Sequence, residues 1–145
     1  MSSIAEGVFD KTLKKTNAWI DDVEASMYLE DRHKAYMALR AVLHALRDRL
    51  TPDEVADLAA QLPMLIRGFF YEGWHPADKP RKYRHKEDFL EQVQKEAPWL
   101  HDKELERAVT AVFCVLSSRI GDGEAPQVRM MMPSELRELW PVAAL

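Results

Sequence analysis

The sequence contains little cysteine, little glycine and no long apolar run. Its 145 residues include one cysteine, Cys114, and five glycines. A single cysteine excludes an intrachain disulfide framework and a cysteine-rich zinc site, and it is typical of a reducing compartment. The longest apolar run, AVFCVL, is too short to cross a bilayer, and the amino terminus has no apolar core of signal-peptide length. We therefore expect a cytoplasmic protein.

Positive charge is not in excess either. The formal net charge is −4, which argues against general binding to nucleic acid or to an anionic membrane. With 47% hydrophobic and 30% charged residues, the composition is that of an ordinary globular protein. A chain of this length can bury about 70% of its unfolded surface in one domain. We expect a single domain, residues 1–145, that needs no covalent staple.

Catalytic motifs are absent as well. The sequence has no HExxH, P-loop, GxSxG or dinucleotide fingerprint. Its five histidines are scattered, and eleven residues separate His33 from His44, the two on one helical stripe, which is too far for a shared metal. Cys114 has no basic neighbour in the sequence to activate its thiol. We predict no catalytic residue, no metal ligand and no cofactor, and interpret the chain as non-enzymatic.

What is present is helical periodicity. An apolar stripe with alternating spacings of four and three predicts a first helix from about residue 9 to 29, through Phe9, Leu13, Thr16, Ile20, Val23 and Met27. Asp31 is the expected N-cap of a second helix, residues 32–50, whose apolar arc is broad enough to need neighbours on more than one side. Its polar stripe is expected to be exposed and consists of His33, Arg40, His44, Arg47 and Asp48. Thr51 to Glu54 then form a capping box at the start of a third helix.

An internal duplication organises the chain. Residues 36–70 aligned with 106–140 at a constant offset of seventy give eight identities, among them Arg49/Arg119, Glu54/Glu124, Pro63/Pro133 and Arg67/Arg137. Unrelated sequences of this length would share about two. Two copies are too few for an open solenoid, so we predict a closed all-α domain with a pseudo-twofold axis. Its parts are a helical extension (1–18), repeat one (19–74), a linker (75–86), repeat two (87–140) and a tail (141–145).

The recurring arginines and glutamates are interpreted as structural. Arg49 and Arg119 lie within the apolar arcs of their helices, and an unpaired buried charge is costly. The nearest recurring acids are Glu54 and Glu124, so we predict the ion pairs Arg49–Glu54 and Arg119–Glu124. Each pair would also be favoured by the helix dipoles.

Two further groups are candidates for binding. Arg67 and Arg137 follow the recurring prolines, and they would either satisfy carbonyls freed by the helix break or bind an anion in a shared groove. An aromatic cluster that would form either core or a partner or ligand surface comprises Phe69, Phe70, Tyr71, Trp74 and Trp140. The basic stretch 79–86 has the composition of a phosphate-contacting loop, although the acids that follow it would neutralise it.

The segments KTNAWIDDV, DRHKAYMALRAVLHALRDRL, AQLPMLIRGFFYEGW and VRMMMPSELRELW cover most of the chain. In these segments the sequence resembles the bacterial family called domain of unknown function 2267. The resemblance implies an all-helical fold, and it implies no activity, substrate, cofactor or catalytic residue.

Three functional hypotheses follow from the sequence. The first is an interaction or assembly module that binds a protein partner or a second copy of itself. The second is a small-ligand-binding domain with a groove between the repeats, for which Arg67, Arg137, Tyr71 and Trp74 are the residues of interest. The third is polyanion binding through residues 79–86, which predicts an affinity that falls with salt.

Overall fold

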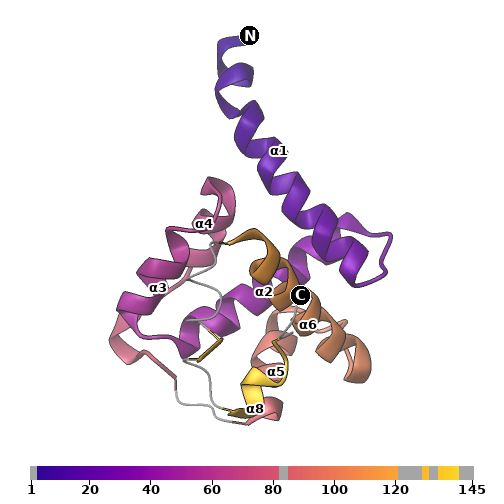
Figure 1. The fold of residues 1–145 in the computed structure, drawn as a ribbon, viewed down its shortest axis with the longest axis vertical. Helices are drawn as coiled ribbons and strands as arrows, with labels where there is room; N and C mark the ends of the chain where they lie inside the picture. The colour runs from indigo at the N-terminus through magenta and orange to yellow at the C-terminus, as the bar shows by residue number, and fades with distance from the viewer. Residues whose placement is uncertain (1–2, 82–84, 121–128, 131–133, 141–145) are drawn as a thin grey trace.

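The fold is all-α in every part that the computed structural model describes, namely residues 3–81, 85–120, 129–130 and 134–140, with side chains from residue 7 onward. This confirms the predicted fold class. The main helices, labelled in Figure 1, are α1 (Ser3–Ser26), α2 (Arg32–Arg49), α3 (Pro52–Ala59), α4 (Met64–Tyr71), α5 (Lys86–Glu96) and α6 (Asp102–Arg119). A 3-10 turn η1 (Pro76–Asp78) and the short helix α8 (Ser134–Arg137) complete the described elements. None of the helices in these ranges combines the length and the apolar character that crossing a lipid bilayer requires.

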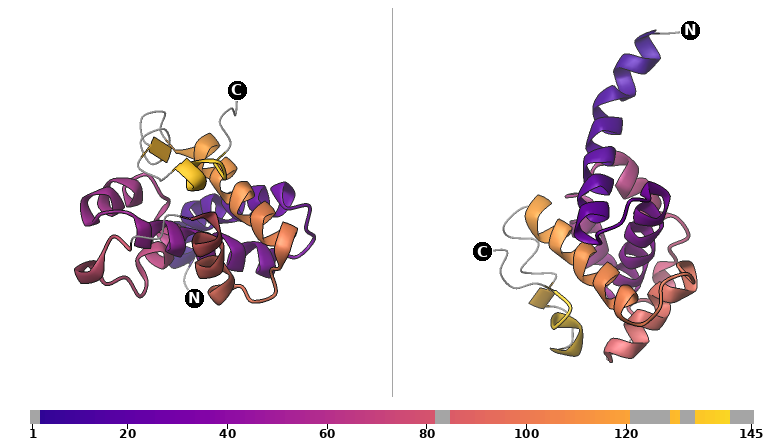
Figure 2. Two further views of the ribbon diagram at one scale, coloured as in Figure 1. Left: turned by 90° about the horizontal axis from the view of Figure 1, so that it is seen from below. Right: turned by 90° about the vertical axis from the view of Figure 1, so that its right-hand side faces the viewer.

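Helix α2 lies at the centre of the molecule. It packs against α1, α4, α5 and α6, and the views in Figures 1 and 2 agree on this arrangement. Its buried residues include Leu39, Val42, Leu43 and Leu46. The broad apolar arc read from the sequence therefore has the neighbours on several sides that it requires.

The predicted helix starts are confirmed by their capping contacts. The Asp31 side chain accepts a hydrogen bond from the Lys34 amide at 3.0 Å. At the start of α3, the Thr51 amide donates to the Glu54 carboxylate at 2.8 Å, and the Glu54 amide donates to the Thr51 hydroxyl at 3.3 Å. These reciprocal bonds satisfy amides that the first helical turn leaves without partners.

Helix α4 is short and is defined by its ends. Pro63 precedes it, and its last turn closes at Gly73, whose φ of +79° is accessible at little cost only to glycine. The Trp74 amide then donates to the Tyr71 carbonyl at 3.0 Å, which completes the turn. This turn brings the end of α4 beside α2.

Helix α1 extends beyond the rest of the fold. Trp19, Val23 and Met27 in its carboxyl-terminal half are buried, whereas residues 7–18 contain no buried side chain. In Figures 1 and 2 this amino-terminal part of the helix points away from the other helices. We call residues 7–18 the projecting half of α1.

The bounds of the helices bear on the predicted duplication. Helices α2 and α6 each have 18 residues, and their first and last residues are seventy positions apart. Helix α8 begins seventy positions after α4. The pseudo-twofold axis and the limits assigned to the two repeats remain predictions.

Candidate functional site

The projecting half of α1 carries an apolar face that is open to solvent. Val8 is 65% exposed, Phe9 51% and Leu13 49%. Phe9 and Leu13 belong to the same stripe as Val23 and Met27, which are buried. One apolar face thus runs along the whole helix, and only its carboxyl-terminal half is covered by the body of the protein.

Helix α4 adds exposed apolar surface near this face. Met64 and Leu65, in its first turn, are 52% and 40% exposed. Their position depends on Arg67, whose Nε donates to the Ala59 carbonyl and whose guanidinium also donates to the Leu62 carbonyl, both at 2.9 Å. Arg67 therefore binds the carbonyls at the end of α3, which is the first of the two roles expected from the sequence.

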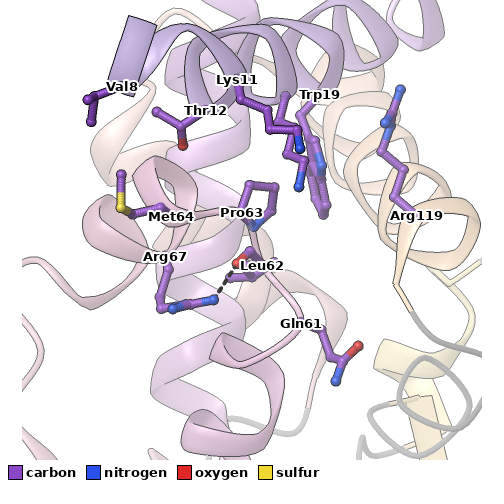
Figure 3. A pocket seen from close by; sticks show the side chains of 11 residues that line it. Val8, Lys11, Thr12, Trp19, Gln61, Leu62, Pro63, Met64, Arg67 and Arg119 are labelled. Atoms are coloured by element: carbon purple, nitrogen blue, oxygen red, sulfur yellow. Dashed lines mark hydrogen bonds between the residues drawn. The ribbon is translucent and has the colours of Figure 1, made fainter. Parts of the chain in front are cut away.

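A groove of about 560 Å³ separates α1 from the junction of α3 and α4 (Figure 3). Val8, Thr12 and Trp19 on α1 form one wall, and Leu62, Pro63 and Met64 face them. Its cationic side chains are Lys11, Lys15, Arg67 and Arg119. The groove therefore combines an apolar lining with a concentration of positive charge in a protein whose net charge is negative.

Among the described side chains, one ion pair involves these cations. The Arg119 Nε donates to an Asp22 carboxylate oxygen at 2.5 Å. Among the side chains that the structure describes, Lys11, Lys15 and Arg67 form no ion pair. Like charges gathered beside a low-dielectric wall create a local positive potential that attracts anionic groups.

The aromatic residues proposed as a binding surface are divided between core and surface. Phe70 and Trp140 are buried, and Trp140 stacks on Phe113 with ring centroids 4.4 Å apart. Tyr71 and Trp74 are half-buried against the same core, with centroids 5.7 Å apart. The buried members of the cluster thus form core rather than an exposed partner surface.

The structure does not bring the proposed ligand residues together. Arg67 lines the groove of Figure 3, but Tyr71, Trp74 and Arg137 do not. Arg137 lies instead with a guanidinium nitrogen 4.0 Å from the Met130 sulfur. Among the described residues that line the groove, all but Arg119 lie before position 68.

The predicted recurring ion pairs Arg49–Glu54 and Arg119–Glu124 stay predictions. The Glu54 carboxylate accepts a hydrogen bond from the Thr51 amide at 2.8 Å in the capping box. Arg119 pairs with Asp22 of α1, and its predicted partner Glu124 lies outside the described residues.

His44 and Arg47 are buried, although the sequence pattern placed them on an exposed polar stripe. His44 Nε2 lies 2.6 Å from the Phe69 carbonyl, and its Nδ1 lies 2.8 Å from a Glu96 carboxylate oxygen. Arg47 donates to the Phe70 and Glu72 carbonyls, both at 2.9 Å. The two side chains thus bind carbonyls at the end of α4. The broad apolar arc of α2 had indicated that this helix has neighbours on several sides, and it was the one feature of the sequence that pointed to such a role.

At the carboxyl-terminal end of the basic stretch, Lys86 and His85 contact acids that lie farther along the chain than the sequence suggested. The Lys86 ammonium lies 3.3 Å from a Glu106 carboxylate oxygen. His85 Nδ1 lies 3.2 Å from a Glu135 carboxylate oxygen. Residues 82–84 lie outside the described ranges. The hydrogen bond and charge of Glu135 raise the pKa of His85. The Lys86 amide, followed by His85, lowers the pKa of Glu135.

No catalytic or metal-binding arrangement is evident in the described part of the chain. Cys114 is a half-buried free thiol. Across the described residues, no group of three or more histidine, cysteine, aspartate or glutamate side chains has a geometry that suits a metal ion. The surface that combines exposed apolar side chains, a groove and unbalanced charge is therefore the one at α1 and α4.

The fold and this surface define an all-α protein with a partly uncovered helix. Comparison with known protein families identifies the family: the model of DUF2267, described as an uncharacterized conserved protein, matches residues 16–139. The chain therefore belongs to the DUF2267 family. No curated protein matches the sequence.

Proposed function

We propose that this protein is an interaction or assembly module without enzymatic activity, and that it binds a protein partner through the projecting half of α1 and the first turn of α4. The observation that carries the proposal is the exposure of Phe9 and Leu13 on the same helical face that α1 buries further along, with Val8 exposed beside them. Covering one such side chain contributes about 1.5–3 kcal/mol. A contiguous exposed apolar face is a common mark of a protein interface. The cytoplasmic location expected from the sequence is part of the proposal.

The test is capture of the partner from the source cells with the full-length chain. A double variant, Phe9→Ser with Leu13→Ser, removes two exposed side chains and should abolish recovery of the partner. The matched control is Tyr28→Asn, because Tyr28 is 85% exposed on a different part of the surface and has a positive φ of 58° that asparagine tolerates. Equal recovery with all three proteins would reject this surface as the binding site.

The other two hypotheses have less support. The small-ligand hypothesis relied on Tyr71, Trp74 and Arg137, none of which lines the observed groove. The polyanion hypothesis relied on five basic residues, of which Lys86 is paired with Glu106. We therefore favour the interaction module over both.

A further inference from the structure

We propose that the partner segment received by this surface is an acidic amphipathic helix, which lies in the groove between α1 and the junction of α3 and α4. This inference rests on the proposed function and specifies the chemistry of the partner. It is carried by the lining of the groove, where four cationic side chains border an apolar wall and floor.

The dimensions of the groove suit a short helix. Its α1 wall runs from Val8 to Trp19, which corresponds to about 16 Å at the helical rise per residue, or about three turns. A helix of that length presents apolar anchors at positions i, i+4 and i+7 along one face. Val8, Pro63 and Met64 offer apolar surface against which such anchors can pack.

The cations define where the acids of the partner should be. Lys11 and Lys15 are about one turn apart on α1, and both line the groove. Two acidic residues spaced four apart on the partner helix would face them both. Arg119 also lines the groove. Among the described side chains its ion-pair partner is Asp22, which its Nε contacts, so its terminal nitrogens are the donors that we assign to a further carboxylate.

Other occupants fit these observations less well. A nucleic acid would place phosphates against the cations but would leave the apolar lining uncovered. An extended peptide that adds to a sheet has no strand to join in the described fold. An amphipathic helix with one acidic edge uses both the apolar and the cationic parts of the groove.

The experiment uses the full-length protein and a designed helical peptide of about 14 residues, with a covalent staple on its outward face. The peptide has leucines at i, i+4 and i+7 and glutamates along one edge, and binding is followed by fluorescence anisotropy. Two variants report on the charge requirement: the double reversal Lys11→Glu with Lys15→Glu, and the matched control Lys14→Glu. Lys14 is exposed on α1 but does not line the groove.

The double reversal should weaken peptide binding at least about tenfold, whereas Lys14→Glu should change it by less than about twofold. A second peptide with lysines in place of the glutamates should bind the double-reversal variant better than it binds the native protein. The inference is overturned if the glutamate peptide binds no better than its glutamine version, or if Lys14→Glu weakens binding as much as the double reversal. It is also overturned if dodecanoate displaces the peptide from the groove at equimolar concentration, or if sedimentation shows a dimer that the double reversal dissociates.

The outcome can be separated from that of the proposed function. Loss of the cellular partner with the Phe9 and Leu13 variant, combined with failure of the acidic peptide, would keep the surface and reject the partner chemistry. Retention of the cellular partner by that variant would reject the surface itself. Selective binding of the acidic peptide, together with loss of the cellular partner by that variant, would support both the surface and the partner chemistry.

Discussion

At the scale of single residues, His44 and Arg47 show how polar groups become part of a core. Both project from the central helix α2, and both bind carbonyls at the end of α4. Those carbonyls have no further helical turn to accept from, so burying them requires donors from elsewhere. Glu96 from α5 reaches His44 from the other side, so this contact links three helices. The prediction that these side chains are exposed to solvent was wrong because the carbonyls that they bind lie 23 or more residues away in the sequence.

Arg47→Ala should destabilise the protein by about 2–4 kcal/mol. The substitution removes two hydrogen bonds to buried carbonyls and leaves Asp48 without its partner at 2.8 Å. Arg40→Ala on the same helix is the matched control, because its ion pair is with the exposed Glu72 and should contribute less than about 1 kcal/mol. The unfolding free energies of the two variants are measured by urea denaturation, with circular dichroism as the signal. Equal effects of the two substitutions would contradict the structural role assigned to Arg47.

At the scale of the helices, α5 is capped by a residue from another element. His85 precedes α5 and provides no side-chain cap of its own. The Glu135 carboxylate of α8 accepts a hydrogen bond from the Lys86 amide at 3.0 Å and also faces His85. A negative charge at this end is favoured by the helix dipole. Glu135 thus holds α8 against the first turn of α5.

The contact between α8 and α5 should depend on pH in both directions. The pKa of Glu135 is lowered in the fold from its ordinary value of 4.5. The stabilisation that the Glu135 carboxylate gives to this contact is therefore present above pH 4.5 and is lost as the pH falls through the lowered pKa. The pKa of His85 is raised from its ordinary value of 6.5. The stabilisation that the protonated imidazole gives to this contact is therefore complete below pH 6.5 and is lost as the pH rises through the raised pKa. The contact between α8 and α5 should be strongest between pH 4.5 and pH 6.5.

Hydrogen exchange of the Lys86 amide, expressed as a protection factor, measures this dependence. The protection factor should be greatest within that window and should decline on either side of it. In a Glu135→Gln variant the amide should be less protected and the profile should be nearly flat. An unchanged profile in the variant would show that another group controls the exchange.

The helices were largely predictable because their signals are local. Asp31 and the capping box at Thr51 act within three residues, so their hydrogen bonds could be inferred from spacing alone. Contacts such as Glu135 with Lys86, or Arg119 with Asp22, join positions far apart in the chain. Sequence spacing carries no information about those pairs, because only the tertiary fold brings their members together.

At the scale of the whole molecule, one pair of contacts supports the internal duplication. Arg47 donates to the Phe70 carbonyl, and the Trp140 indole donates to the Ser117 hydroxyl at 2.7 Å. Ser117 and Trp140 occupy positions seventy residues after Arg47 and Phe70. Equivalent positions therefore contact each other in both halves, although the chemistry of the contact differs. This is expected if two copies kept their packing while their side chains diverged.

The location of the candidate site could not have been read from the same pattern. The apolar stripe of α1 is continuous from Phe9 to Met27, and periodicity alone does not reveal where the supporting body ends. In the structure, α2 and α6 cover only the carboxyl-terminal half of that stripe. The groove likewise requires Arg119 to come beside α1, a tertiary contact between residues nearly one hundred positions apart. Helices were thus predictable from local pattern, and the surface that they leave uncovered was not.

Deletion of residues 1–14 should separate folding from binding. The deleted residues from position 7 onward contain no buried side chain, and the family match begins at residue 16, so the unfolding free energy should change by less than about 1 kcal/mol. Partner capture and binding of the acidic peptide should both be lost, because Val8, Phe9, Leu13 and Lys11 are removed. A longer deletion through residue 22 also removes the buried Trp19 and should unfold the protein, which makes it the control for the folding assay. If the shorter deletion cost several kcal/mol, the projecting half would have to pack on the body of the protein, and its apolar face would be structural rather than available to a partner.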